Sequence, residues 1–172
     1  AAEDLRAARE RRLRLREAEA QHLVRGRLAV EDRNRNGSDP ALARKARAEG
    51  RRLAISRGGE LEVTVRNRTG RGGRSQEYAL ALAVELDGLR GVAALGADTD
   101  GIDGGDGRVD DPAGAVIGAD TLARADERHV DARKALDNND ATTLFEALGD
   151  VVHTGPTHTN VNDFRVILVE PA

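Results

Sequence analysis

Short aliphatic runs separated by polar, glycine-rich loops set the pattern of this chain. Val92–Ala97, Ala113–Ile117 and Phe164–Val169 are apolar runs that are too short for helices, and they predict buried strands. Leu53–Ser56 predicts a fourth strand. Glu60–Arg66 predicts a fifth with one wet face, because its apolar residues alternate with polar ones.

Longer segments with helix-forming composition lie between these runs. They are residues 3–28, 41–49, Tyr78–Leu86, Asp120–Asp126, Val130–Leu136 and Ala141–Ala147. The alternation of strands and helices predicts the α/β class, with a layered α/β/α domain built on a mixed sheet. We expect residues 1–50 to form a basic helical arm and linker, and residues 51–172 to form the domain.

Charge supports this division of the 172 residues. The net charge is −3, yet residues 1–57 carry 16 Lys and Arg against nine Asp and Glu, and the remainder is acidic. The sequence contains no cysteine, which excludes disulfides and thiolate chemistry. No apolar run approaches the ~18 residues of a membrane span. We therefore expect a cytoplasmic protein without a membrane partner. The chain starts with Ala rather than Met, which favours a fragment or a processed product.

The basic arm has three interpretations. Its irregular leucines among many Arg and Glu are typical of a solvated helix packed along one seam. An arm for nucleic acid is the second interpretation, but interleaved acidic residues and the lack of aromatic residues in it argue against such a partner. A partner surface in a homo-oligomer is the third, since helices of mixed charge do pair.

Three polar loops are candidates for chemistry: Gly72–Glu77, Asp98–Asp111 and Thr154–Asp163. The first places a glycine-rich turn and Arg74 before a buried helix, and such a helix start favours an anion. The second supplies clustered carboxylates, and the third hydroxyls and amides. Together they offer a cationic clamp, oxygen ligands for Mg²⁺ and substrate-orienting groups, which are the parts that phosphoryl transfer needs.

A structural interpretation of the same residues stays open. Asp98, Asp100 and Asp103 are also suited to turns and helix caps, and Asn160 and Asn162 to Asx turns. A structural Ca²⁺ is a further alternative, although the spacing does not follow an EF-hand loop. No histidine pair has the spacing of a metal site.

Several motifs together resemble a known family. Their order and spacing are similar to those of the C-terminal (MOFRL) domain of the type II glycerate kinases. The matching segments are Ser56–Val65, Gly72–Glu77, Asp98–Gly104, Asp137–Asp140 and Thr154–Arg165.

The resemblance implies a kinase, a transferase that phosphorylates D-glycerate on its 2-hydroxyl. It implies ATP as co-substrate and Mg²⁺ or another divalent cation as cofactor. Family members have an N-terminal Rossmann-like domain that supplies a catalytic lysine and much of the opposite wall of the active site. No matching segment for that domain is present here, so we expect a fragment that is inactive without it.

The resemblance also implies roles for individual residues. Catalytic roles fall to Arg74, Asp100 and Asp103, and metal binding to Asp98, Asp100 and Asp103. Substrate contacts fall to Gly72, Gly73, Thr157, Asn160, Asn162 and Asp163, and support around them to Glu60 and Glu77. An alternative function is a non-catalytic module that binds a small anion or a magnesium nucleotide.

The chain departs from the family pattern at several positions. Ser75 stands where Asn is usual, His158 stands where Gly is usual, and Arg57 is an extra residue in the Ser-Gly-Gly-Glu loop. Gly105–Asp111 differs from the usual short linker. A non-glycine residue at position 158 costs about 1 kcal/mol if the backbone there needs a positive φ.

Overall fold

The computed structural model describes residues 29–31, 39–105 and 107–171. Its strands are β1 (Ala29–Glu31), β2 (Leu53–Gly59), β3 (Val92–Asp98), β4 (Gly114–Ile117), β5 (Val151–Val152) and β6 (Asp163–Val169). Its helices are α2 (Asp39–Ala48), α3 (Arg74–Leu86), α4 (Thr121–Glu127), α5 (Ala132–Asp137) and α6 (Ala141–Leu148). The basic arm predicted over residues 3–28 lies outside the described residues.

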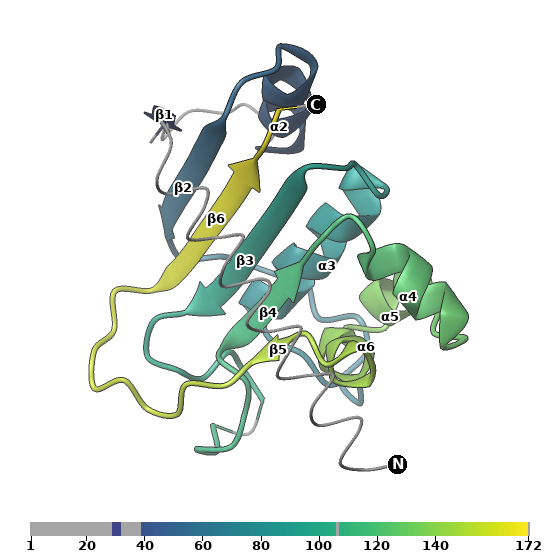
Figure 1. Cartoon of the computed structure of the whole chain (residues 1–172). Helices are drawn as coiled ribbons and strands as arrows, with labels where there is room; N and C mark the ends of the chain where they lie inside the picture. Colours follow the sequence, from purple (N-terminus) through teal and green to yellow (C-terminus); the bar gives the residue numbers. More distant parts are fainter. Residues whose placement is uncertain (1–28, 32–38, 106, 172) are drawn as a thin grey trace, which may run out of the picture.

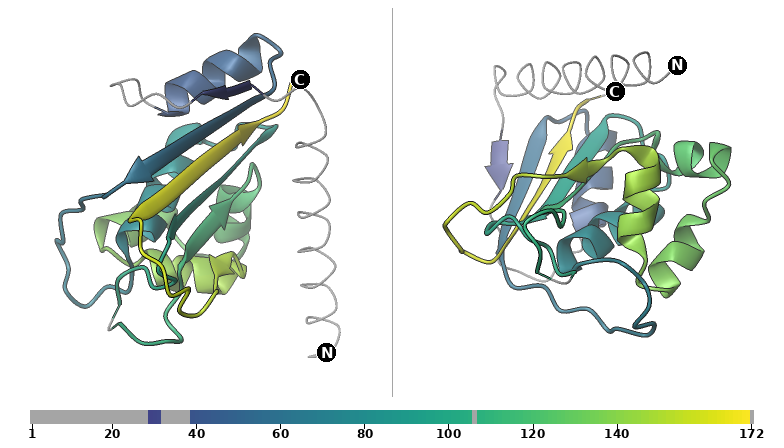
Figure 2. Two further views of the ribbon diagram at one scale, coloured as in Figure 1. Left: turned by 90° about the vertical axis from the view of Figure 1, so that its left-hand side faces the viewer. Right: turned by 90° about the horizontal axis from the view of Figure 1, so that it is seen from below.

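The strands form one mixed sheet in the order β1-β2-β6-β3-β4-β5 (Figure 1). β1 and β2 are parallel, and every other neighbouring pair is antiparallel. Helices α2 and α3 cover one face of the sheet, and α4, α5 and α6 continue this layer beyond the β4–β5 edge (Figures 1 and 2). The expected α/β class with a mixed sheet is therefore confirmed.

Burial alternates along the central strands because successive side chains point to opposite faces. In β3, Val92, Ala94 and Asp98 are buried towards the helices, whereas Ala93 is exposed on the other face. The first turn of α3 comes very close to β3 at Gly96, where a Cβ would lie 2.6 Å from the Ser75 carbonyl oxygen. Only glycine permits this contact, which brings Arg74 to the sheet.

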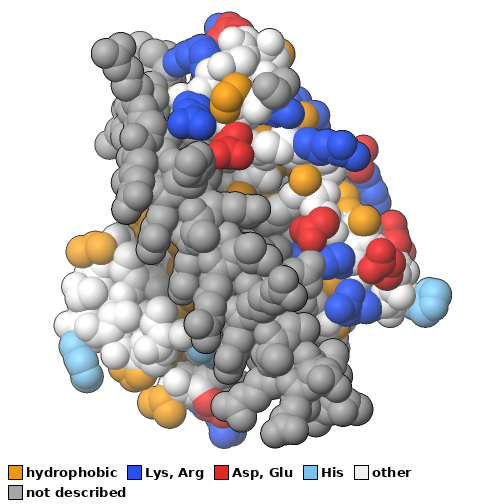
Figure 3. Space-filling view, viewed as in Figure 1, with side chains coloured by type: hydrophobic (Ala, Val, Ile, Leu, Met, Phe, Trp, Pro, Cys, Tyr) orange, Lys and Arg blue, Asp and Glu red, His pale blue; other side chains and the backbone are white. Residues whose placement is uncertain are grey.

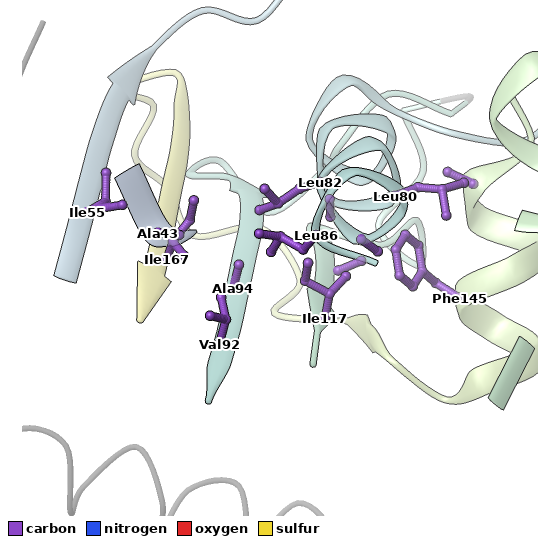
Figure 4. Packing of buried hydrophobic residues seen from close by; sticks show 14 of the residues in the cluster. Ala43, Ile55, Leu80, Leu82, Leu86, Val92, Ala94, Ile117, Phe145 and Ile167 are labelled. Carbon is purple, nitrogen blue, oxygen red and sulfur yellow. The ribbon is translucent and has the colours of Figure 1, made fainter. Parts of the chain in front are cut away.

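The core between the sheet and the helices is aliphatic, apart from one aromatic ring. Leu80 and Phe145 are fully buried where α3 meets α6, and Leu82 and Leu86 of α3 lie over the sheet (Figure 4). α2 adds Ala43 to the same cluster. Part of residues 1–50 therefore packs into the domain core rather than extending from it.

One strand prediction is wrong. Glu60–Arg66 does not join the sheet, although its alternation is that of a strand. Side chains from distant loops take the place of a neighbouring strand there. The structure also contains two short strands that the sequence did not predict, β1 and β5, and α3 begins at Arg74 rather than at Tyr78.

The surface carries both signs of charge. Figure 3 shows Lys and Arg interspersed with Asp and Glu over the described part of this face, without a large patch of either sign. Among the described helices, none combines the length and apolar character needed to cross a membrane.

Candidate functional site

The ends of three neighbouring strands meet at one edge of the sheet. Asp163 begins β6 and lies opposite both Gly59, the end of β2, and Asp98, the end of β3. This register places the carboxyl groups of Asp98 and Asp163 side by side, and both residues are buried. Two buried carboxylates at this spacing repel each other unless a proton or a nearby cation offsets their charge.

Arg74 supplies that cation from the first turn of α3. One guanidinium nitrogen, Nη2, lies 3.2 Å from Asp98 Oδ2 and 3.7 Å from Asp163 Oδ1. The other, Nη1, lies 2.8 Å from Glu60 Oε1. We call these four residues the arginine cluster. It contains one positive and three negative groups.

Burial and charge act in opposite directions on the cluster. Burial lowers the pKa of Arg74, but Asp163, Glu60 and Asp98 raise it, and the net shift is upward. Burial also raises the pKa of Asp98, as do the nearby charges of Asp100 and Asp163, while a hydrogen bond from the Asp100 amide lowers it. Arg74 is therefore a permanent cation that already has anionic partners.

Glu60 is the exposed member of the arginine cluster. Its side chain is 65% exposed, compared with 35% for Arg74, 5% for Asp98 and 0% for Asp163. An exposed ion pair contributes little free energy. Glu60 can therefore give up its place on Arg74 Nη1 far more easily than the two buried aspartates can leave Nη2.

The side chain of Asp103, from the loop after β3, lies against the start of α3. Its two carboxylate oxygens accept hydrogen bonds from the Ser75 amide at 2.9 Å and the Gln76 amide at 2.8 Å. The sequence predicted an anion at this helix start, and in the structure the anion is an internal side chain. Gly73 is required beside it, because a Cβ there would lie 1.8 Å from the Asp103 carbonyl oxygen. These two amide groups are therefore not available to a ligand.

Asp163 ties three parts of the chain together. Its Oδ1 accepts a hydrogen bond from the Ser75 hydroxyl at 3.1 Å, and its Oδ2 accepts one from the Leu61 amide at 2.6 Å. Ser75, which the sequence analysis noted only as a departure from the family pattern, thus fixes α3 to β6. Its hydroxyl could not be assigned a partner from local sequence because Asp163 is distant along the chain.

The two remaining polar loops form one structure beside the arginine cluster. Asp100 accepts hydrogen bonds from the Ile102 amide at 2.9 Å and from Asn160 Nδ2 at 3.2 Å. The Thr157 amide donates to the Asp100 carbonyl at 3.0 Å, and the Thr99 hydroxyl donates to the Asn162 carbonyl at 2.7 Å. The side chains of this loop pair are largely exposed, so they can contact a ligand.

His158 and Asn162 have left-handed backbones in the same loop, with φ of 59° and 66°. Asn and His are found in this region more often than most other non-glycine residues, although a non-glycine side chain still costs some free energy there. The backbone at His158, where the family usually has glycine, therefore does adopt a positive φ.

Two predicted residues lie away from the arginine cluster. Glu77 accepts a hydrogen bond from Asn139 Nδ2, and a Cβ at Gly72 would lie 3.1 Å from the Asn139 carbonyl oxygen. Asn139, buried with φ of 51°, organises this second region, and the sequence analysis gave it no role of its own. The repeated Asp and Asn of residues 137–140 are the only signal that could have identified it.

The carboxylates brought together here already have hydrogen-bond partners within the protein. Both oxygens of Asp103 are used by α3, both of Asp163 accept hydrogen bonds, and Asp98 bonds Arg74 and the Asp100 amide. In the part of the chain that the structure describes, no group of three or more His, Asp and Glu residues could hold a metal ion. The predicted set of Asp98, Asp100 and Asp103 is therefore not a preformed metal centre.

Fold and site together define a small α/β domain with an ion-paired arginine at one edge of its sheet. Residues 53–163 match the MOFRL family, and the chain belongs to that family. The resemblance found in the sequence is thereby confirmed.

Relatives and a solved structure agree with this assignment. The chain is 39% identical over 116 residues to the D-glycerate 2-kinase of Thermotoga maritima, covering 67% of this chain and 27% of that protein. A protein of Agrobacterium vitis, provisionally named a hydroxypyruvate reductase, is 52% identical over 113 residues, covering 65% of this chain and 28% of that protein. The crystal structure of the T. maritima glycerate kinase has a TM-score of 0.71 and 28% identity, over 83% of this chain and 36% of that one. The chain thus spans under a third of the length of these two relatives.

Proposed function

We propose that this chain is the part of a glycerate kinase that provides Arg74 to the anionic reactants. Two findings support the proposal: the named glycerate kinases among its relatives, and the position of the guanidinium at the sheet edge. Because the chain spans only 27% of the T. maritima enzyme, we infer that turnover needs a further domain. The Rossmann-like domain with the catalytic lysine, implied by the resemblance, is the candidate.

The observation that carries the proposal is that the two terminal nitrogens of Arg74 have partners of very different burial. Asp98 and Asp163 are buried and fix Nη2, whereas Glu60 is exposed and pairs with Nη1. A carboxylate or phosphate oxygen can take the place of Glu60 without disturbing the buried side. Arginine binds both groups well because its planar fork matches their oxygens.

The proposed reaction transfers the terminal phosphate of ATP to the 2-hydroxyl of D-glycerate. Arg74 would bind the glycerate carboxylate or the phosphate in transfer, where developing negative charge is stabilised by a positioned cation. Asp100, Thr157, Asn160 and Asn162 of the loop pair would contact the polar groups of the substrate. Asp103 acts as a positioning residue, since it fixes the helix start that carries Arg74. We assign no step to a divalent cation.

A binding and activity experiment on the 172-residue chain tests the proposal. D-glycerate, and separately ATP, is titrated into isotope-labelled protein while amide chemical shifts are followed, and phosphorylated product is assayed in parallel with Mg²⁺ present. We expect glycerate to shift signals around Arg74 and Glu60, with no product. Arg74→Ala should weaken glycerate binding by about tenfold or more, as expected for a lost charge-assisted contact.

Arg71→Ala is the matched control. Arg71 belongs to the same glycine-rich segment, but its guanidinium pairs with Glu146 on α6. Equal loss of binding in both variants would refute a specific role for Arg74. Product formed by the chain alone would refute the need for a further domain. If the chain still binds glycerate but gives no product even when the Rossmann-like domain is supplied, the non-catalytic anion-binding module would be favoured.

A further inference from the structure

Two arginines face each other across the sheet, next to the arginine cluster. Arg57 of β2 is the direct cross-strand partner of Arg165 of β6, and the two strands lie side by side (Figure 1). Arg165 is two residues beyond Asp163 on β6, so both project from the helix-covered face. We call Arg57 and Arg165 the facing arginines. Like charges directly opposite each other in a sheet are destabilising unless an anion offsets them.

One carboxylate offsets the charge of Arg57. Asp39, the first residue of α2, accepts hydrogen bonds at Oδ1 from Arg57 Nε at 2.9 Å and Nη2 at 2.7 Å. Its other oxygen, Oδ2, accepts a hydrogen bond from the Tyr78 hydroxyl at 3.3 Å. The side chains of Arg57 and Asp39 are only 14% and 12% exposed. Asp39 is therefore committed to Arg57 and Tyr78.

Arg165 has no carboxylate of its own. Its Nη2 donates a hydrogen bond to the Gly58 carbonyl at 2.9 Å, and its guanidinium carbon lies 5.5 Å from the centre of the Tyr78 ring. Within residues 39–105 and 107–171, Arg165 forms no ion pair, and its buried Nε has no hydrogen-bond partner. A buried N–H group without an acceptor is rare in proteins and costs free energy. The guanidinium thus retains both its positive charge and unused donors.

Tyr78 does not supply the missing negative charge. Burial raises the pKa of its hydroxyl and Asp39 raises it further, while Arg165 and Arg57 lower it, and the net shift is upward. The phenol is therefore neutral, and Arg57, Arg165 and Asp39 sum to one positive charge. The arginine cluster beside them sums to two negative charges. A second anionic group brought to this edge of the sheet is therefore offset best at Arg165.

Arg165 is also close to Arg74. Arg74 and Tyr78 are four residues apart on α3, so they lie on the same side of the helix, about 5.4 Å apart along its axis. On β6, Asp163 beside Arg74 is separated from Arg165 by about 7 Å of strand. Both elements thus lead from one guanidinium to the other. The proposed reaction has two anionic reactants, and Arg74 can bind only one of them.

We propose that the facing arginines form a second anion site, in which Arg165 binds a phosphate group with support from Arg57. Phosphate suits the site better than a carboxylate, because it carries nearly two negative charges at neutral pH and can offer a different oxygen to each arginine. That the phosphate belongs to a reactant rests on the proposed function. The anion site itself does not.

A titration of inorganic phosphate into the full chain tests this inference. The amide and arginine Nε–H signals of isotope-labelled protein are followed at constant ionic strength and neutral pH. We expect saturable shifts at Arg57, Tyr78 and Arg165. Arg165→Gln should raise the phosphate dissociation constant for these signals by about tenfold, as expected for a lost charge-assisted contact. Arg74→Ala should leave it within about threefold of wild type, because Arg74 belongs to the neighbouring site.

Three further variants make the result specific. Arg133→Gln removes the same charge at an exposed position on α5 and should have no effect. Asp39→Asn removes the carboxylate that Arg57 binds, so phosphate should bind about threefold more tightly. Arg165→Lys keeps the charge but loses the planar fork, and it should weaken binding by about threefold, which provides a second test if Arg165→Gln does not fold. An absence of saturable shifts at Arg165 in wild type, or equal affinity in wild type and both Arg165 variants, would overturn the proposal.

Parallel titrations with D-glycerate and ATP separate this inference from the proposed function. Phosphate binding at Arg165 without any glycerate binding at Arg74 would refute the proposed function and leave the second anion site in place. Glycerate binding at Arg74 without phosphate binding at Arg165 would do the reverse. Shifts of Arg165 with ATP would identify the nucleotide as the source of the phosphate, whereas shifts with inorganic phosphate alone would identify free phosphate as the ligand.

Discussion

Opposing effects act on the pKa of the Asp103 carboxyl group. Burial raises its pKa, hydrogen bonds from the Ser75 and Gln76 amides lower it, and the nearby charge of Asp163 raises it. The result is a pKa of about 6, above the ordinary value of 3.8. Folding therefore favours the protonated form, and the ionised form is held in place at a cost in stability.

The sign of the pH dependence follows from this shift. Asp103 contributes most to stability below its unfolded pKa, and that contribution falls as pH rises towards about 6. We expect the unfolding free energy of wild type relative to Asp103→Asn to fall by about 2–3 kcal/mol between pH 4 and pH 7. Urea denaturation at constant ionic strength measures it. Asp126→Asn, at an exposed position on α4, should not change the pH profile, and a profile for Asp103→Asn parallel to wild type would contradict the prediction.

At the scale of elements, the sequence predicted a strand correctly where the apolar run hydrogen-bonds to neighbouring strands of the sheet. The apolar runs of β2, β3, β4 and β6 are buried on a sheet face, and this local pattern is visible in the sequence. Glu60–Arg66 has the same alternation, but the side chains of Asn139 and Asp163 bond its backbone instead of a neighbouring strand. Partners this distant along the chain leave no local signal.

The start of α3 shows the same limit for the site. The sequence indicated an anion near Gly73 and Arg74, and the resemblance singled out Asp98, Asp103 and Asp163. The sequence left a helix cap open for Asp103, but it did not reveal that the helix is α3 or that Asp163 binds Ser75, since both contacts join residues that are distant along the chain. Residue types were predictable, whereas their division between binding and support was not.

Gly73→Ala tests the close packing at the start of α3. A Cβ at this position would lie 1.8 Å from backbone oxygen of Asp103, so the helix start or the loop must shift. We expect the unfolding free energy to fall by about 2–3 kcal/mol, as for overpacking of a rigid site. Gly58→Ala is the control, because a Cβ there meets nothing within 4 Å. Chemical denaturation compares them, and equal effects would show that the cap tolerates a side chain.

The whole molecule is held together by a core with few large side chains. Phe145 of α6 is fully buried against α3, whereas Phe164 of β6 is 40% exposed on the opposite face of the sheet. One phenylalanine therefore lies inside the core and the other lies on the surface of the same domain. Stability of the domain depends on the first of these rings far more than on the second.

Phe145→Ala should lower the unfolding free energy by about 3–5 kcal/mol, because it leaves a cavity between the helix layer and the sheet. Phe164→Ala should cost less than about 1 kcal/mol, since the ring is already partly hydrated. Thermal and urea unfolding of the two variants supply the comparison. Similar losses would mean that the outer face of β6 is covered in solution.

The strand register at Asp163 restricts where insertions and deletions are tolerated in this chain. A residue gained or lost within β6 would turn Asp163 to the opposite face; a gain would bring Phe164, and a loss Asn162, to the guanidinium of Arg74. Residues gained or lost in the stretch 153–156, which precedes the residues proposed to contact the substrate, leave that alternation intact. Among functional homologues, length differences should therefore collect before Thr157 and be absent from the seven residues that follow Asn162.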